Sequence, residues 1–223
     1  MSKTIITAVD ETDLGSFKKV IDSLDSDLCM LKIGSVSFNA FGHEAVFYAS
    51  KKGFDIFLDL KLHDIPNTVK KSIEGLKSLP ISMITLHTSG GIKMMQSAMD
   101  AVKGSKIKIF GVTALTSLSD DDTNQIYQRD ASSQVNAMLD LAEESGIDGV
   151  VCSPHELNLV SKRVGLLSIT PGIRLVNTED DQSRVMTPKQ AIELGADYLV
   201  IGRPITASDD ISASLKEIYK SIQ

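Results

Sequence analysis

Acidic and basic side chains gather at the end of one apolar segment of this 223-residue sequence. Asp59, Lys61 and Asp64 fall within six residues, directly after the largely apolar run 55–58. In a strand, side chains two positions apart share a face, so Asp59 and Lys61 are expected to project together, about 7 Å apart along the backbone. A buried carboxylate or ammonium is costly unless it finds a partner. Such charges at the C-terminal end of a strand therefore predict a chemical site.

A further charge, Lys32, interrupts the apolar segment 30–34, which is expected to form the strand next to the one that carries Asp59. Lys32, Asp59 and Lys61 would then alternate in sign across two adjacent strands. Two interpretations are open: a buried ion-pair network that only fixes the register of the strands, or part of an active site. The collection of these charges at one end of adjacent strands favours the active site.

Short β-branched segments alternate with amphipathic segments along the whole sequence. The expected strands are Thr4–Asp10, Leu28–Gly34, Asp55–Lys61, Met83–Thr88, Lys108–Ala114, Gly149–Ser153, Leu167–Pro171 and Tyr198–Gly202. The expected helices lie near Leu14–Leu24, Phe41–Lys52, Thr68–Ser78, Ile92–Val102, Ser133–Ser145, Glu156–Ser161, Pro188–Leu194 and 209–223. Thr187 before Pro188 is a typical helix start. Glycines that end helices are expected at positions 53, 104, 146 and 195.

Eight such strand–helix units predict an α/β fold with a parallel sheet closed into a (β/α)8 TIM barrel, one catalytic domain spanning residues 1–223. An open, doubly wound sheet is the alternative. It is disfavoured because the loop after the first strand, Asp10–Asp13, lacks the glycines of a dinucleotide-binding turn. The two longest loops after strands, 115–132 and 172–187, are candidate lids, with plain surface decoration as the alternative.

Gly202 and Arg203 follow the eighth expected strand. A glycine lets a phosphate approach the main chain, an arginine supplies charge-assisted donors, and a helix is expected to begin within a few residues. A plain turn with a solvated arginine is the alternative. Because the loops after strands seven and eight of a TIM barrel often hold phosphate, we favour a phosphate site. The loop after the seventh strand adds Arg174 and Gln182, and Gln182 alone indicates little.

The composition, 42% hydrophobic and 23% charged, is typical of a globular protein. A net charge of −6 argues against nucleic acid as a partner but leaves an anionic small molecule open. Without an apolar run of about 18 residues or a signal-peptide pattern, we expect no membrane partner and a cytoplasmic location. Cys29 and Cys152 are expected to be buried thiols. The four histidines are scattered, so no metal site is expected.

Several ordered segments, taken together, resemble the orotidine 5′-phosphate decarboxylase family over nearly the whole chain. They are Ala8–Asp10, Lys32–Gly34, Asp59–Thr68, Val112–Ser117, Pro171–Arg174 and Ile201–Ile205. The Asp-x-Lys-x-x-Asp core alone is shared with sugar-phosphate decarboxylases, whereas its His-Asp-Ile-Pro-Asn-Thr extension and the Lys-x-Gly of the second strand are more specific. Val9, where a leucine is frequent, is a minor departure.

The resemblance implies that Lys32, Asp59, Lys61 and Asp64 form a charged catalytic array. It also implies a homodimer in which Asp64, Ile65 and Thr68 reach the active site of the other subunit. The implied contacts to substrate are Asp10 with the ribose, Thr116 with the pyrimidine edge, Gln182, Gly202 and Arg203 with the phosphate, and Arg174 at the same end of the site. The loop that carries Gln182 would be the lid.

The implied reaction is the decarboxylation of orotidine 5′-monophosphate to UMP, the last step of UMP synthesis, without a cofactor or metal. Loss of CO₂ leaves a carbanion at C6 that no adjacent carbonyl delocalises simply. Lys61, held by Asp59 and Asp64, would stabilise this charge and then protonate C6.

Two other functions compete with this one. A metal-dependent sugar-phosphate decarboxylase would need an acid near the position of Lys32, because magnesium prefers carboxylate ligands and a lysine repels it. A non-catalytic phosphate-ligand binder would not need two lysines and two acids packed together. The roles of His63 and His87 stay open between packing and ligand binding.

Overall fold

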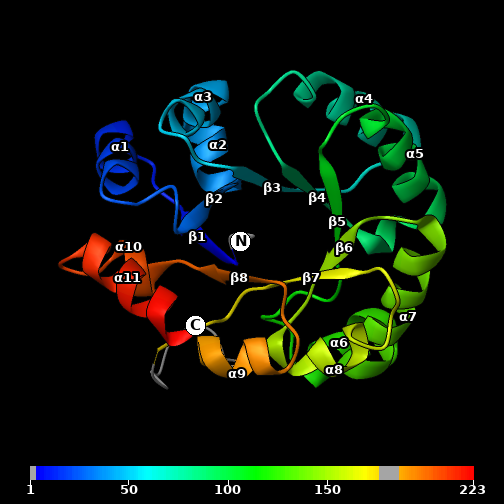
Figure 1. Ribbon diagram of the computed structural model, residues 1–223. Helices are drawn as coiled ribbons and strands as arrows, with labels where there is room; N and C mark the ends of the chain where they lie inside the picture. The colour runs from blue at the N-terminus through cyan, green and yellow to red at the C-terminus, as the bar shows by residue number, and fades with distance from the viewer. Residues whose placement is uncertain (1–3, 176–185) are drawn as a thin grey trace.

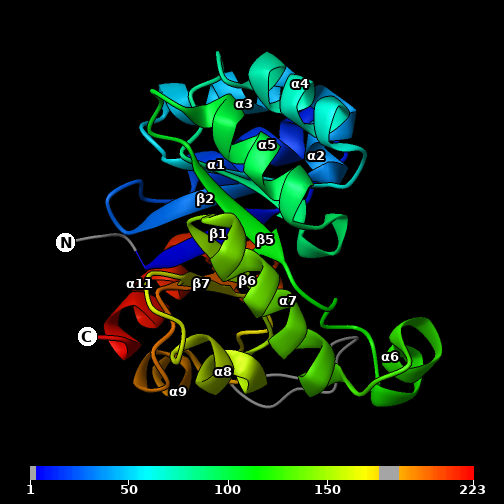
Figure 2. The same ribbon diagram turned by 90° about the vertical axis from the view of Figure 1, so that its right-hand side faces the viewer.

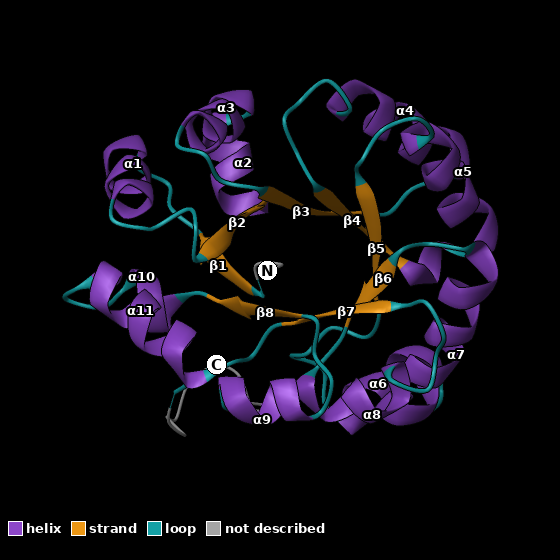
Figure 3. Cartoon of the chain, in the orientation of Figure 1, coloured by secondary structure: helices purple, strands orange, loops and turns teal. Residues whose placement is uncertain are grey.

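Eight parallel strands close into a barrel in the computed structural model, which describes residues 4–175 and 186–223 (Figures 1 and 3). The strands are β1 (Ile5–Val9), β2 (Cys29–Gly34), β3 (Ile56–Leu62), β4 (Met83–His87), β5 (Lys108–Val112), β6 (Gly149–Val151), β7 (Leu167–Thr170) and β8 (Tyr198–Ile201). Their order around the barrel follows the sequence, and β1 pairs with β8, with Ile5 opposite Leu199. The predicted (β/α)8 barrel is confirmed.

Both faces of the strands are apolar, as expected for a sheet covered on each side. The barrel interior contains a cluster that includes Ile6, Phe57 and Phe110, whose two rings meet edge to face with centroids 6.5 Å apart. The larger cluster, outside the barrel, packs the other strand face against the helices. Because side chains alternate between the two faces of a strand, every second side chain points into the barrel. A polar side chain at such a position is enclosed by the barrel.

Helices surround the barrel and lie outside the ring of strands (Figure 3). They are α1 (Leu14–Asp22), α2 (Ser35–Phe41), α3 (His43–Lys51), α4 (Pro66–Leu76), α5 (Ile92–Val102), α6 (Asp120–Tyr127), α7 (Ala131–Ser145), α8 (Leu157–Val160), α9 (Pro188–Glu193), α10 (Arg203–Thr206) and α11 (Ile211–Ser221), with two single-turn helices at Thr88–Gly90 and Pro154–Glu156. In the described ranges, no helix has the length and apolar character that a membrane crossing requires.

Local signals set the helix ends as predicted. Thr187 accepts from the Gln190 main-chain N–H in a capping box, and Pro188 takes the first turn of α9. The glycines predicted to end helices all have positive φ, between 72° and 92°. They lie at positions 53, 104, 146 and 195.

Three helices were missed by the sequence predictions: α2, α6 and the four-residue α10. The residues of α2 follow β2 without a loop, and Gly42, with φ 56°, separates α2 from α3. The predicted lid loop 115–132 contains α6, which begins at the capping box of Ser119 with Asp122 and contacts α7 (Figure 2). The polar composition of α6 hid its helical period, whereas its start carries the Ser-x-x-Asp pattern that favours a helix.

Candidate active site

A cavity of about 570 Å³ lies at the C-terminal ends of the strands. Its lining combines the first two strands, β3 and the loops that follow β7 and β8. Eight of the predicted site residues line it: Asp10, Lys32, Asp59, Lys61, Thr116, Arg174, Gly202 and Arg203. The fold therefore brings together residues from the beginning, middle and end of the sequence.

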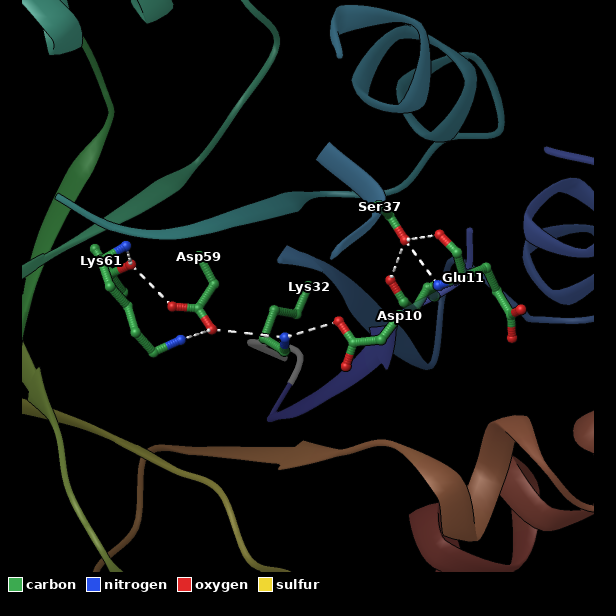
Figure 4. Close-up of polar contacts among 8 residues, drawn as sticks. Asp10, Glu11, Lys32, Ser37, Asp59 and Lys61 are labelled. Carbon is green, nitrogen blue, oxygen red and sulfur yellow. Dashed lines mark hydrogen bonds and ion pairs between the residues drawn. The ribbon is translucent and has the colours of Figure 1, made fainter. Parts of the chain in front are cut away.

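Four charged side chains form a row along this cavity, with alternating sign (Figure 4). Lys61 Nζ lies 2.7 Å from Asp59 Oδ2, and Lys32 Nζ lies 3.5 Å from the same oxygen. Lys32 Nζ also lies 3.3 Å from Asp10 Oδ1. The predicted alternation of charge among Lys32, Asp59 and Lys61 across two strands is present. Asp10, directly after β1, adds a fourth charge to the row.

Asp59 is the most enclosed member of the row, with 7% of its surface exposed. Burial on its own would raise the pKa of this carboxyl, but Lys32 and Lys61, together with hydrogen bonds from Lys61 and Thr85, outweigh burial and lower the pKa below its usual value. Asp59 is therefore a carboxylate at neutral pH, with two ammonium groups directed at one of its oxygens.

The backbone of β3 is irregular where it carries this row. Leu58 pairs with Ile84 and Leu62 with Leu86, so the register with β4 shifts between them. Lys61 has φ +50°, which is uncommon for a residue other than glycine. Asp59 and Lys61 do meet as predicted, but on a bulged strand and not on a regular one.

The side chain of Thr85 lies opposite this bulge and was missed by the sequence predictions. It is fully buried on β4, accepts from the Lys61 main-chain N–H (2.9 Å) and donates to Asp59 Oδ1 (2.9 Å). The signal that could have found it is a hydroxyl in an otherwise apolar strand, because buried polar groups almost always have a hydrogen-bond partner.

Ser37, at the first turns of α2, was also missed and holds the loop after β1. The Ser37 hydroxyl accepts a hydrogen bond from the Glu11 main-chain N–H (2.8 Å). The same hydroxyl is within donating distance of two main-chain carbonyls, those of Val9 and Glu11, each at 2.9 Å (Figure 4). This loop carries Asp10. Ser37 therefore fixes the outer end of the charged row.

Gly34, at the end of β2, leaves space for the ion pair between Lys32 and Asp10. A Cβ at this position would lie 2.8 Å from Lys32 Nζ and 3.1 Å from Asp10 Oδ1. The glycine of the Lys-x-Gly motif thus has a steric reason inside the site.

The opposite end of the cavity is formed by the loops after β7 and β8. Arg174 is 8% exposed, and its Nη1 donates to the Ile173 carbonyl at 3.1 Å. Arg203 is exposed at the start of α10, directly after Gly202. The two guanidinium groups bring positive charge to this end of the cavity, as a phosphate site requires.

Three predicted site residues do not line the cavity, and a fourth lies outside the described residues. Asp64 and Ile65 lie in the exposed segment between β3 and α4, with Ile65 66% exposed and its N–H donating to Asp64 Oδ1 at 2.6 Å. Thr68 is exposed in the first turns of α4. Gln182 lies outside the residues that the structure describes.

Two histidines lie beside the lysine end of the row. The rings of His63 and His87 are 5.3 Å apart. Burial, and then the nearby His63 and Lys61, lower the pKa of His87, while Asp59 opposes this shift. Neither histidine lines the cavity.

A metal site needs several donor side chains around one point. Across residues 4–175 and 186–223, no group of three or more His, Cys, Asp or Glu side chains is arranged to hold a metal ion. Cys29 and Cys152 are buried and form no disulfide, as predicted, and burial strongly raises the pKa of Cys152.

Comparison with known proteins places the chain in one family. The model of the orotidine 5′-phosphate decarboxylase / HUMPS family matches residues 3–218. A relative named orotidine 5′-phosphate decarboxylase, from Wolbachia pipientis subsp. Culex pipiens, is 45% identical over 221 residues, 98% of each chain. One of the same name from Ehrlichia canis is 45% identical over 98% of this chain and 97% of its own.

A solved structure supports the same placement. The crystal structure of orotidine 5′-phosphate decarboxylase from Lactobacillus acidophilus has a TM-score of 0.87 with this chain at 34% identity, and the match covers 100% of both chains. The family match and these likenesses all run through the barrel from its first strand to its last. The chain therefore belongs to the orotidine 5′-phosphate decarboxylase / HUMPS family, a family of carboxy-lyases.

Proposed function

We propose that this protein decarboxylates orotidine 5′-monophosphate to UMP without a metal or organic cofactor. The observation that carries the proposal is the pairing of Lys61 with Asp59 at 2.7 Å inside the cavity. The family and the names of its relatives support the same reaction.

Lys61 would be the proton donor of the reaction. When CO₂ leaves C6 of the pyrimidine, the electron pair of the broken bond stays on C6. An ammonium held beside C6 stabilises this charge, because a preorganised cation acts strongly where water is excluded. It then transfers a proton to C6. Asp59 would hold Lys61 in place and lie beside the departing carboxylate.

Binding of the phosphate would take place at the other end of the cavity. Arg203, Gly202 and Gln182 would contact the phosphate, and Arg174 would shape that end of the site. Asp10 would bind the ribose. Thr116 would contact the edge of the pyrimidine. Binding energy gained at the remote phosphate could then be used to hold substrate and row in the reactive arrangement, with the loop of Gln182 as a lid.

A second subunit would complete the site. Asp64 belongs to the proposed catalytic array, yet it lies away from the cavity together with Ile65 and Thr68. A homodimer in which these three residues enter the neighbouring cavity explains their exposure. We further propose a cytoplasmic location for the enzyme.

Two alternative functions remain testable. In a metal-dependent sugar-phosphate decarboxylase, a divalent cation would occupy this end of the barrel, but Lys32 points its ammonium at Asp59 and Asp10 and would repel it. A phosphate-ligand binder would bind orotidine 5′-monophosphate without changing it.

The test is turnover of orotidine 5′-monophosphate by the purified protein in excess chelator, followed by ultraviolet absorbance. Lys61→Ala serves as the control that keeps the cavity but removes the proton donor. Rapid conversion by the wild type and near-complete loss in the variant would support the proposal. Turnover only after addition of magnesium would point to the sugar-phosphate reaction, and tight binding without conversion would point to a binder. Normal turnover by Lys61→Ala would exclude its proton-donor role.

A further inference from the structure

The hydroxyl of Thr85 joins the two residues at the centre of the charged row. We infer that Thr85 is a positioning residue for decarboxylation, which fixes the Asp59 carboxylate and the Lys61 main chain relative to each other. This inference rests on the proposed function. Thr85 does not line the cavity, so it acts on the reaction through its two neighbours and not by touching substrate.

Through Thr85, Lys61 is attached to Asp59 at two points. Its ammonium lies 2.7 Å from Asp59 Oδ2. Its main-chain N–H donates to Thr85 Oγ1, and the Thr85 hydroxyl donates in turn to Asp59 Oδ1, both at 2.9 Å. The two attachments close a ring that contains the whole Lys61 side chain, so the direction of the ammonium depends on the hydroxyl.

Strand pairing cannot supply this restraint. The register between β3 and β4 is interrupted from Leu58 to Leu62, with Thr85 opposite the interruption. The bulge leaves Lys61 at φ +50°, and its N–H bonds to a side chain instead of a strand carbonyl. Residues in such sparsely populated conformations persist only where their surroundings hold them.

Asp59 also needs a second anchor. The terminal torsion of an aspartate has a broad, roughly two-fold preference, so one bonded oxygen does not fix the plane of the carboxylate. Both lysines bind Oδ2, and Thr85 alone among the described side chains donates a hydrogen bond to Oδ1. Thr85 therefore sets which way Oδ2, and the lysines on it, face the cavity.

Two pairs of variants separate the hydroxyl from the shape of the side chain. Thr85→Val keeps the shape and removes the hydroxyl. Thr85→Ser and Thr85→Ala both remove the methyl group, and only serine keeps the hydroxyl. Thr7→Val is the matched control, because Thr7 is fully buried in β1 and its hydroxyl has no hydrogen-bond partner in the described structure.

We expect Thr85→Val and Thr85→Ala to lower kcat about ten- to a hundred-fold, the effect of losing a hydrogen bond to a charged group. KM should change little, because the phosphate end is untouched. Thr85→Ser and Thr7→Val should stay near the wild type. If valine prevents folding, serine against alanine makes the same comparison. Equal kcat in the serine and alanine variants would overturn the inference.

Titration of Asp59 supplies a readout that needs no substrate. The charged or titratable groups facing Asp59 are Lys32 from β2, Lys61 from β3 and His87 from β4. Carbon-13 NMR of the carboxyl should show a higher pKa in Thr85→Ala than in Thr85→Ser, because the hydroxyl favours the carboxylate. Identical pKa values would overturn the inference. Wild-type protein without turnover would instead refute the proposed function, and the titration would still decide whether Thr85 fixes Asp59.

Discussion

Asp59 takes part in two of the three ion pairs of the charged row. Both ammonium groups share its Oδ2, and the carboxylate is nearly enclosed. Removing a single partner from a buried charge cluster lowers the free energy of unfolding by more than the cluster itself contributes to it, because the remaining charges stay buried and unbalanced. Each residue of the row is thus expected to affect its neighbours, and single substitutions there will not be additive.

Arg203→Ala should mainly weaken substrate binding. Arg203 lines the cavity directly after Gly202 and would act as a charge-assisted donor to the phosphate. We expect KM for orotidine 5′-monophosphate to rise about ten- to a hundred-fold. Steady-state kinetics checks this, with the same variant assayed for thermal stability. Unchanged KM and kcat would remove Arg203 from the phosphate site.

His87 should make the protein less stable in mild acid. Because its pKa is lowered in the folded state, first by burial and then by His63 and Lys61, the unfolded chain binds this proton more tightly. The folded state therefore loses stability as pH falls below the unfolded pKa of about 6.5, toward the lowered folded value. In His87→Asn this loss disappears, so Tm should fall less between about pH 7 and pH 5 than in the wild type. Parallel Tm profiles would refute this.

At the scale of elements, the C-terminal halves of the strands determine the site more than their N-terminal halves. Most strand residues contribute apolar side chains to the barrel interior or to the helix-facing core. The C-terminal halves of β2 and β3 and the loops after β1, β7 and β8 contribute the charges. Small changes of backbone at these ends should move charges without unfolding the barrel.

Gly34→Ala tests this separation of site from fold. The added Cβ would meet the mobile ends of Lys32 and Asp10, at 2.8 and 3.1 Å, and no backbone atom. We expect Tm close to the wild type and a clear fall in kcat, because the Lys32 ammonium must shift. Gly75→Ala is the control, since a Cβ there meets nothing within 4 Å and alanine favours helix α4. An unchanged kcat in Gly34→Ala would show that the ion pair tolerates displacement.

The sequence could predict the barrel because every strand and most helices carry strong periodicity and clear ends. It could also predict which charges meet, since Lys32, Asp59 and Lys61 stand at strand ends that a barrel brings together. It could not predict the bulge at Lys61 or the hydrogen bonds of Thr85 and Ser37. These depend on the register between neighbouring strands and on a loop held by a helix, which no local pattern encodes.

The sequence did not predict helix α6 for a different reason. Its sequence, Asp120–Tyr127, is polar and has only Thr123 buried, so it lacks the apolar stripe on which helix prediction depends. The capping box of α6 is visible in the sequence, but a capping pattern without apolar periodicity is a weak indication of a helix. The phosphate contact of Gln182 and the lid role of its loop stay predictions, because residues 176–185 lie outside the described residues.

At the scale of the whole molecule, one chain by itself leaves Asp64 outside the cavity. Under the proposed shared site, Lys61→Ala and Asp64→Ala are each inactive as homodimers. After subunit exchange, a mixed dimer has one site with both residues intact, so an equimolar mixture should recover about a quarter of wild-type activity. Turnover after mixing measures this, with light scattering to confirm dimers. No recovery in mixed dimers would place each site within one chain.

The closure of β1 onto β8 also has a consequence during synthesis. Asp10 follows the first strand and Arg203 follows the last, yet both line one cavity. A ribosome releases the first three strands long before the eighth exists, so a growing chain carries the charged row before it has the end that is proposed to bind phosphate. Under the proposed function, ligand affinity would therefore arise only with the final strand, and a bound nucleotide would connect the two ends of the polypeptide. By mass action, substrate and product would then stabilise the finished barrel over every incomplete one.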